Sequence, residues 1–148
     1  MINRKSIKSA LVVGSMLIAS AAMPVAANNK GGPTTSGDLS ANRASADLIV
    51  PALCEAPVNV GDTKTGTLTV YIFQPSGRLL NIGIGTADVP CDGTQANVMV
   101  TVDAIPGLKF KPGPATVVYA MTEQTMDSAG AVTASSTTES GATVNLRP

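Results

Sequence analysis

The chain has 148 residues, with ten Asp and Glu, ten Lys and Arg, two cysteines and no histidine or tryptophan. This length suits a single domain. The lack of histidine excludes Ser-His-Asp and Cys-His catalysis and histidine-based zinc or copper sites. A chain cut after residue 27 would keep ten carboxylates and seven cations, for a net charge of 7 − 10 = −3. No basic patch survives that cut, so neither nucleic acid nor an anionic membrane surface is an expected partner.

The first 27 residues have the three-part layout of a secretory signal peptide. Asn3-Arg4-Lys5 and Lys8 are followed by an apolar run over residues 10–22, and Val25-Ala26-Ala27 supplies small side chains for a cleavage site. A run of about 13 apolar residues is too short for a membrane-spanning helix, which needs roughly 20. The sequence therefore predicts cleavage after Ala27 and a secreted or periplasmic protein that has no membrane association after cleavage.

Residues 28–46 are rich in Asn, Gly, Thr and Ser, and Leu39 is their only large apolar residue. A segment that buries little apolar surface cannot offset the entropy lost on ordering it. We therefore predict a disordered tail or spacer over residues 28–46 and a single folded domain over residues 47–148.

Seven short strands are predicted in this domain, because apolar and polar residues alternate between Gly, Pro and Asp turn residues. The clearest alternation places Leu68, Val70 and Ile72 on one face. Pro51 lacks an N–H and so predicts an edge or a kink in the first strand. The predicted strands cover residues 47–53, 65–74, 78–86, 95–103, 115–123, 131–138 and 142–146.

Turn residues predict three of the connections. Pro75-Ser76-Gly77 fits a tight hairpin, Asp92-Gly93 is a two-residue hairpin signal, and Glu139-Ser140-Gly141 separates the last two strands.

The strand over residues 78–86 is expected to turn its branched apolar side chains, Leu80, Ile82 and Ile84, towards the core. Gly83 and Gly85 would then lie on its other face, where they indicate a bulge or a close approach of another backbone.

Cys54 and Cys91 are the only cysteines. An even cysteine number in an exported chain favours a structural disulfide. A reactive thiol or a metal site lacks support, because there is no CxxC spacing and no histidine. We predict a Cys54–Cys91 disulfide and expect no cofactor and no metal.

Asp88 and Asp92 are the nearest candidates for a carboxylate pair of the glycosidase type. They flank Pro90 and Cys91 at a turn, there is no tryptophan to hold a sugar, and no ligand-dense calcium loop of the EF-hand type occurs. We expect solvated turn residues here and no enzymatic activity.

Seven short strands with Gly and Pro corners indicate an all-β domain, and specifically an immunoglobulin-like antiparallel β-sandwich. A small closed barrel is the alternative. The segment Cys91-Asp92-Gly93-Thr94, the Val-rich strand after it, and Phe110-Lys111-Pro112-Gly113-Pro114-Ala115 together resemble small secreted bacterial immunoglobulin-like domains. The resemblance covers about residues 48–146 and implies a fold and a compartment. It departs from antibody domains, because no tryptophan packs on the disulfide and both cysteines lie early in the chain.

The chain also resembles fimbrial subunits, which are exported, have an early disulfide and polymerise by inserting an N-terminal strand into a neighbour. Residues 28–46 lack the alternating apolar residues that such a strand needs, and Asn145-Leu146-Arg147-Pro148 lacks a terminal aromatic residue. We therefore expect a non-enzymatic binding or adhesion module, monomeric, for an unknown protein or glycan ligand. A structural subunit of a surface polymer is the alternative, and an enzyme that uses carboxylates alone is the third class.

Overall fold

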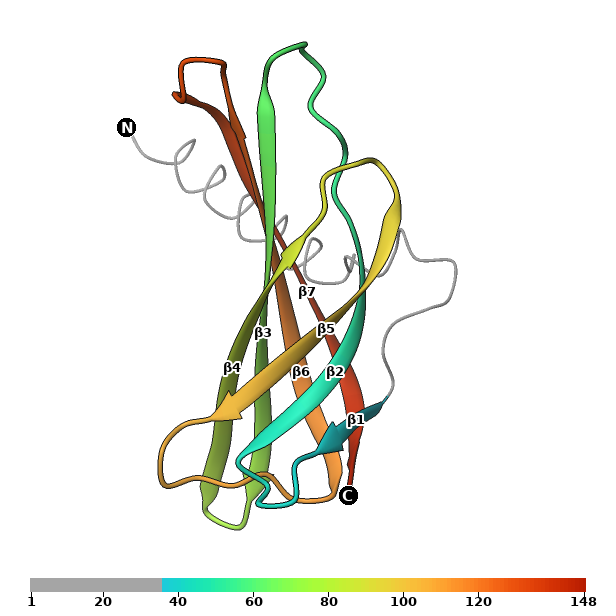
Figure 1. Ribbon diagram of the computed structural model, residues 1–148. Helices are drawn as coiled ribbons and strands as arrows, with labels where there is room; N and C mark the ends of the chain where they lie inside the picture. Colours follow the sequence, from blue (N-terminus) through green and yellow to red (C-terminus); the bar gives the residue numbers. More distant parts are fainter. Residues whose placement is uncertain (1–35) are drawn as a thin grey trace, which may run out of the picture.

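The structure is a computed structural model that describes residues 36–148, and these residues form strands without any helix. The strands are β1 (Ser36–Leu39), β2 (Ser45–Leu53), β3 (Thr63–Ser76), β4 (Leu79–Val89), β5 (Gln95–Ala104), β6 (Gly113–Met126) and β7 (Val132–Arg147). They close into a barrel in the order β1-β2-β5-β4-β3-β6-β7 (Figure 1). The predicted all-β class is confirmed, with one closed barrel in place of two separate sheets.

The barrel interior is filled by alternate residues of the long strands. On β3, Leu68, Val70 and Ile72 are fully buried, as the alternation predicted, while Tyr71 and Phe73 lie on the outer side. Only two aromatic side chains, Phe110 and Tyr119, are buried in the core. The other buried apolar residues are Ala46, Leu48, Val50, Ala52, Cys54, Val89, Val98, Val100, Val102, Ala115, Val117, Met121, Val144 and Leu146.

Strand β1 closes the barrel between β7 and β2. It pairs parallel with β7, where Ser36 is opposite Asn145, and antiparallel with β2, where Asp38 is opposite Asp47. The prediction of a disordered tail is therefore wrong from Ser36 onwards. The predicted signal peptide and the rest of that tail lie outside the described residues.

The physical reason for this error is the way β1 is held. A Cβ added to Gly37 would lie 3.1 Å from Leu146 Cδ2 and 3.2 Å from Leu48 Cγ. The strand is thus stabilised by backbone pairing and by a close approach to two core leucines. Neither feature leaves an apolar pattern in the sequence of β1.

Strand β7 is one continuous strand, so the predicted turn at residues 139–141 is wrong. Glu139, Ser140 and Gly141 pair in sequence with Ala120, Tyr119 and Val118 of β6. Because β6 offers an unbroken ladder over this length, the chain stays extended through Gly141. The two last predicted strands are the two halves of β7.

The predicted β3–β4 hairpin is confirmed. Ser76 pairs with Leu79 across a two-residue loop, and Gly77 adopts a φ of 62°, which favours glycine. Pro51 also behaves as predicted: it pairs with Asn97 of β5, and among the described residues no strand borders its other side.

The predicted hairpin at Asp92-Gly93 is wrong. Strand β4 pairs with β5 at two positions only, Gly83 with Ala104 and Ile84 with Asp103, both far from this corner. Strand β5 instead pairs with β2 along its length, from Ser45–Asp103 to Leu53–Gln95. The residues between β4 and β5 therefore lead the chain from β4, which pairs mainly with β3, to β5, which pairs mainly with β2.

Strand β4 also faces the opposite way from the prediction. Leu80 and Ile84 are exposed and Ile82 is half-buried, whereas Gly83 is buried on the inner face. A Cβ on Gly83 would lie 2.5 Å from Cζ of Phe110, and one on Gly85 would overlap the carbonyl oxygen of Thr101. The predicted close approach is confirmed, but it takes place on the inner face. The branched apolar residues of β4 are consequently turned outwards.

Candidate binding surface

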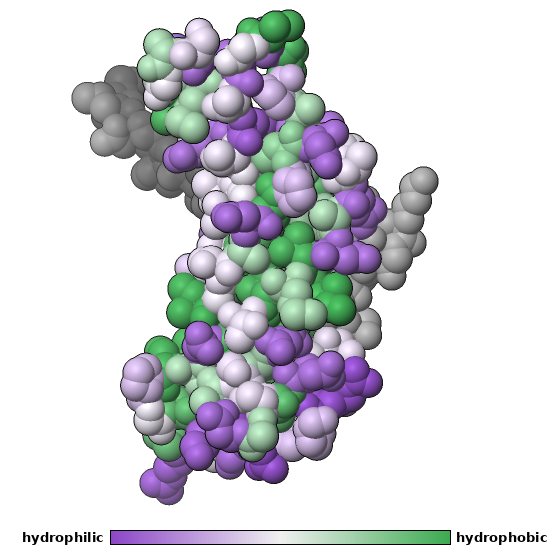
Figure 2. All heavy atoms as spheres, viewed as in Figure 1, coloured by the Kyte–Doolittle hydropathy of each residue, from purple (hydrophilic) through white to green (hydrophobic). Residues whose placement is uncertain are grey.

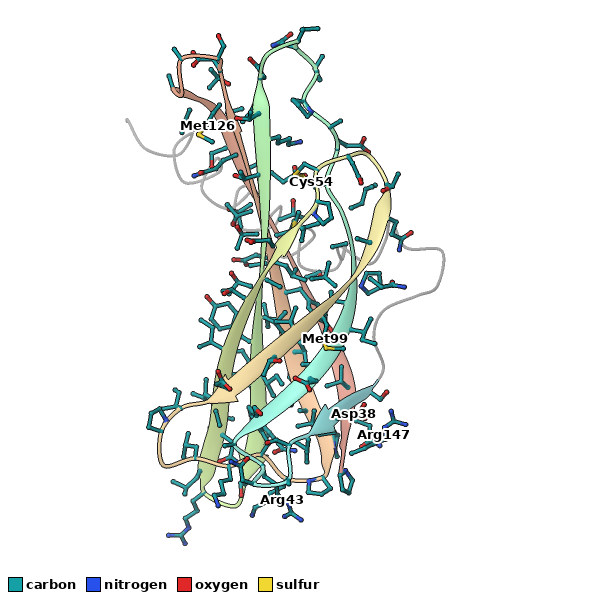
Figure 3. The ribbon with its side chains drawn as sticks, in the orientation of Figure 1. Asp38, Arg43, Cys54, Met99, Met126 and Arg147 are labelled. Carbon is teal, nitrogen blue, oxygen red and sulfur yellow. A yellow bond between two sulfur atoms is a disulfide. The ribbon has the colours of Figure 1, made fainter. Side chains whose placement is uncertain are left out.

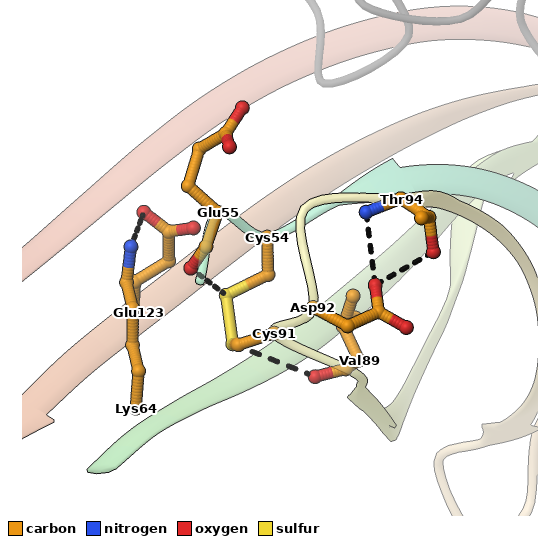
Figure 4. The surroundings of a disulfide bond; sticks show 8 residues. All are labelled: Cys54, Glu55, Lys64, Val89, Cys91, Asp92, Thr94 and Glu123. Carbon is orange, nitrogen blue, oxygen red and sulfur yellow. Dashed lines mark hydrogen bonds and ion pairs between the residues drawn. A yellow bond between two sulfur atoms is a disulfide. The ribbon is translucent and has the colours of Figure 1, made fainter. Parts of the chain in front are cut away.

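The predicted disulfide is present and joins Cys54, directly after β2, to Cys91, just after β4 (Figure 4). The two Cα atoms are 4.4 Å apart and the Cys54 side chain is fully buried. Beside the bond, the Gly93 N–H donates to the Cys54 carbonyl at 3.1 Å. The described residues contain no free cysteine. The bond therefore links the β2–β3 loop to the β4–β5 turn and leaves no thiol for catalysis.

Asp88 and Asp92 have different surroundings. Asp88 is exposed at the end of β4 and is opposite Thr67 of β3. The Asp92 carboxylate accepts hydrogen bonds from the Thr94 hydroxyl at 2.7 Å and the Thr94 N–H at 2.9 Å. These two hydrogen bonds lower the pKa of Asp92 below its ordinary value. Asp92 thus stays ionised as a turn residue.

Within residues 36–148, no group of three or more acidic or cysteine side chains is placed to hold a metal ion. The same stretch contains no helix that is long and apolar enough to cross a membrane.

A more distinctive feature is a patch on the outer side of β3, β4 and β6, here called the apolar face. The rings of Tyr71 and Phe73 stack with their centroids 6.4 Å apart and an interplanar angle of 18°. Ile84 and Ile82 of β4 lie opposite Tyr71 and Phe73, and Val118 of β6 lies opposite Tyr71 on the other side. Through these pairings the five side chains form a contiguous group.

The apolar face contains no charged side chain, but a carboxylate lies beside it. Phe73 is bordered by Thr116, and Ile84 by Asp103 of β5. Ile84 leaves 47% of its surface exposed, although covering such a side chain stabilises by about 1.5–3 kcal/mol. The other four members of the apolar face, Tyr71, Phe73, Ile82 and Val118, are half-buried. A group of apolar side chains that water reaches in this way is a candidate interaction site.

Sequence reasoning missed this surface, because it assigned Ile82 and Ile84 to the core. The available signal was the pair Gly83 and Gly85. Because glycine has no side chain, the face of a strand that carries glycines is the face that another backbone or a large side chain can approach closely. By that criterion, Ile82 and Ile84 would have been predicted on the outer side, next to Tyr71 and Phe73.

Three buried polar atoms form a weaker candidate. Asn81 Nδ2, the Tyr119 hydroxyl and Ser140 Oγ have no hydrogen-bond partner among the described residues. Tyr119 and Ser140 are opposite one another on β6 and β7. Burial raises the pKa of Tyr119 to about 12 from an ordinary value of 10.0. The hydroxyl is therefore neutral at physiological pH and a cost to the core.

We predict that Tyr119→Phe leaves the free energy of unfolding at pH 7 unchanged or raises it by up to about 1 kcal/mol, because it removes an unpaired buried hydroxyl. In the parent, the unfolded chain loses the Tyr119 proton near the ordinary pKa of 10.0, whereas the folded protein holds it to about 12, so the free energy of unfolding falls as the pH rises from 10 through 12. Urea unfolding at a series of pH values from 7 to 12 measures this effect. The free energy of unfolding should fall less between pH 10 and 12 in the variant than in the parent.

Tyr71→Phe, on the outer face, is the control. Its free energy of unfolding should fall with alkaline pH as steeply as that of the parent. A Tyr119→Phe variant that is destabilised by more than about 1 kcal/mol would show that the hydroxyl has a partner in solution.

The apolar face is thus the described surface whose chemistry best fits a binding role, and it is carried by three strands of the barrel rather than by mobile loops. Comparisons with protein-family models, with curated proteins and with solved structures found no match.

Proposed function

We propose that this protein is an exported, non-enzymatic binding or adhesion module that uses the apolar face to hold a protein or glycan ligand. The observation that carries the proposal is the outward placement of Ile82 and Ile84 beside the stacked Tyr71 and Phe73. Aromatic side chains contribute strongly to binding once water is excluded from them. The absence of histidine from the sequence supports a non-enzymatic role.

The strand order supports an immunoglobulin-like assignment for the barrel. In the constant type of that fold, the first, second, fifth and fourth strands form one sheet, and the third, sixth and seventh form the other. The order β1-β2-β5-β4-β3-β6-β7 contains these two groups as consecutive runs. Strand β4 pairs with β3 over residues 66–76 of β3 and with β5 at two positions only, so β4 associates with the third, sixth and seventh strands, and the barrel departs from the constant type at this strand.

Export is supported by two independent features. The first 27 residues have the layout of a signal peptide, with cleavage proposed after Ala27. The buried Cys54–Cys91 disulfide is compatible with an oxidising compartment, such as the periplasm or the exterior.

Binding to intact cells and to an immobilised glycan panel tests the proposal. The variant Tyr71→Ser/Phe73→Ser/Ile84→Ser removes three members of the apolar face. We expect its affinity for any bound target to fall by roughly thirtyfold, as for loss of a binding hot spot.

The matched control is Ile49→Ser/Met99→Ser, which removes a more exposed cross-strand pair, 54% and 62% exposed, from the outer side of β2 and β5. This control should bind like the parent. Equal binding by both variants, or an equal loss in both, would exclude the apolar face as the binding site.

A structural subunit of a surface polymer is the second candidate. It is favoured by the distribution of loop charges: Glu55, Asp62, Asp92 and Asp127 lie in the β2–β3, β4–β5 and β6–β7 connections, whereas Arg43, Arg78, Lys109 and Lys111 lie in the connections at the opposite end of the barrel.

A further inference from the structure

The loops of the barrel divide between two ends (Figure 1). The β2–β3 loop, the β4–β5 turn and the β6–β7 turn lie at one end. The β1–β2 turn, the β3–β4 turn and the β5–β6 loop lie at the other, together with the C-terminus. Figure 3 shows Arg43 and Arg147 at this second end and Met126 near the first.

The first end is here called the acidic end, because its loops carry Glu55, Asp62, Asp92 and Asp127. Several of these carboxylates are held in place by local hydrogen bonds. Asp62 accepts from Asn59 Nδ2 at 3.2 Å, and Asp127 accepts from the backbone N–H groups of residues 129 and 131, both at 2.9 Å. The disulfide fixes the bases of two of the three connections, so this end is ordered before any partner arrives.

The second end is the basic end, whose loops carry the exposed residues Arg43, Arg78, Lys109 and Lys111. Buried Gln74 anchors the β5–β6 loop: its Nε2 donates to the Lys111 carbonyl at 2.7 Å, and its Oε1 accepts from the Lys111 N–H at 2.8 Å. The Phe110 N–H donates to the Arg43 carbonyl at 2.9 Å. These bonds tie two basic loops together.

None of these eight loop charges forms an ion pair within the part of the chain that the structure describes. The ion pairs there are Lys64–Glu123 at 3.6 Å and Arg147–Asp38 at 3.2 Å, and neither uses one of the eight side chains named above. Each end therefore presents four unpaired loop charges of one sign, and the exposed Asp103 near the end of β5 adds a negative charge beside the basic end.

Both ends also carry large apolar side chains without cover. At the acidic end, Val58 and Val60 are 96% and 106% exposed, and Val132 is exposed beside the β6–β7 turn. Apolar side chains are visible at the tip of the β2–β3 loop at the top of Figure 2. At the basic end, Leu79 is 67% exposed, and Ile105 is exposed as well.

We propose that the acidic end of one copy of this chain docks on the basic end of a second copy. Opposite charges attract the two ends, and burial of the valines against Leu79 and Ile105 adds a favourable apolar contribution. Two acidic or two basic ends repel each other, so the contact is head to tail. Such a contact leaves a free end on each partner and builds linear chains unless it closes into a ring.

This inference is independent of the apolar face, which lies on the side of the barrel and stays accessible in such a chain. Weak, transient complexes lie at the low end of interface sizes, below about 1,200 Å² in total, and we expect a contact of this class, with a dissociation constant of about 100 μM. A dilute sample is then monomeric, as the sequence predicts, and association emerges only at high local concentration.

Sedimentation equilibrium of the purified protein at increasing salt is the first test. The Debye length falls from about 30 Å at 0.01 M salt to about 3 Å at 1 M. The dissociation constant should therefore rise at least roughly tenfold over this range. A protein that stays monomeric up to about 1 mM at low salt would overturn the proposal.

Charge reversal provides the specific test. Glu55→Lys/Asp62→Lys cancels the charge of the acidic end, because two cations then stand beside Asp92 and Asp127. Arg78→Glu/Lys109→Glu cancels the charge of the basic end in the same way, beside Arg43 and Lys111. Each variant alone should associate at least roughly tenfold more weakly than the parent. A mixture of the two should recover association, because the unchanged basic end of the first variant meets the unchanged acidic end of the second.

The matched control is Glu139→Lys/Ser135→Lys/Thr143→Lys on the side of β7, which changes the net charge by the same +4. It should associate like the parent at equal ionic strength. A control that weakens association as much as the end variants, a mixture that fails to recover it, or a dimer that never grows further would contradict head-to-tail docking.

Discussion

Replacing Cys54 by alanine is expected to lower the free energy of unfolding by about 3–4 kcal/mol. The disulfide closes a loop with a sequence separation of 37. In the chain-entropy model, breaking it increases the conformational entropy of the unfolded chain by an amount worth about 3–4 kcal/mol. Domains of this size are stable by about 5–15 kcal/mol in total. The single crosslink therefore accounts for a large fraction of the stability, and the melting temperature should fall by at least about 10 °C.

Thermal and urea unfolding of Cys54→Ala, Cys91→Ala and the double variant measure this effect. The double variant should lose no more than either single variant, because the crosslink can be broken only once. Reducing the parent with dithiothreitol should reproduce the same loss, and the reductant should leave the double variant unchanged. A reduced parent that unfolds at the same urea concentration as the oxidised one would show that the crosslink contributes no stability.

The disulfide also acts on the acidic end of the barrel. It fixes the start of the β2–β3 loop, which carries Val58 and Val60, against the turn that carries Asp92. A loop held in its bound conformation loses less entropy on docking. The same bond therefore connects the stability of the fold with the proposed contact between copies.

The central strands were predictable because their side chains alternate over many residues. Leu68, Val70 and Ile72 of β3, and Val98 and Val100 of β5, lie on the buried faces that the period of two assigned to them. The disulfide followed from cysteine number and expected compartment. In each case, one local pattern or count was sufficient.

Strand β1 and the direction of the Asp92-Gly93 corner were not predictable in this way. Gly37 is held by two core leucines that come from β2 and β7, far apart in the sequence. Gly93 donates to the Cys54 carbonyl, and β5 runs along β2, so tertiary contacts decide the path at a corner whose residues favour a hairpin. Such contacts leave no periodic signal.

The two candidate surfaces differ in how much of each could be predicted from the sequence. The apolar face was hidden by the reversed assignment of β4, since isoleucines on a strand were expected to be inside. The charges at the two ends are plain in the sequence, but their segregation depends on which loops share an end. That follows only once the strand order is known.

The reversed face of β4 leads to the second large effect: Gly85→Ala should lower the free energy of unfolding by about 3 kcal/mol, at the upper end of overpacking substitutions. The added Cβ would overlap the Thr101 carbonyl oxygen and lie 2.9 Å from its carbonyl carbon and 3.0 Å from Val102 Cα. All three atoms belong to the backbone of β5, which is paired with β2 along this stretch and cannot give way locally. The strand must therefore move outwards and loosen the β4–β5 contact.

Gly141→Ala on β7 is the matched control, because its added Cβ would lie 3.5 Å from the Val117 carbonyl oxygen, an ordinary contact. Gly141 does not have a positive φ, so its backbone accepts alanine without strain. Because alanine makes the unfolded chain less flexible, the free energy of unfolding should stay the same or rise by up to about 1 kcal/mol. Urea unfolding of both variants distinguishes the two sites. If Gly85→Ala unfolds at the same urea concentration as Gly141→Ala, β4 does not pack its glycine face against β5, and the outward placement of Ile82 and Ile84 fails with it.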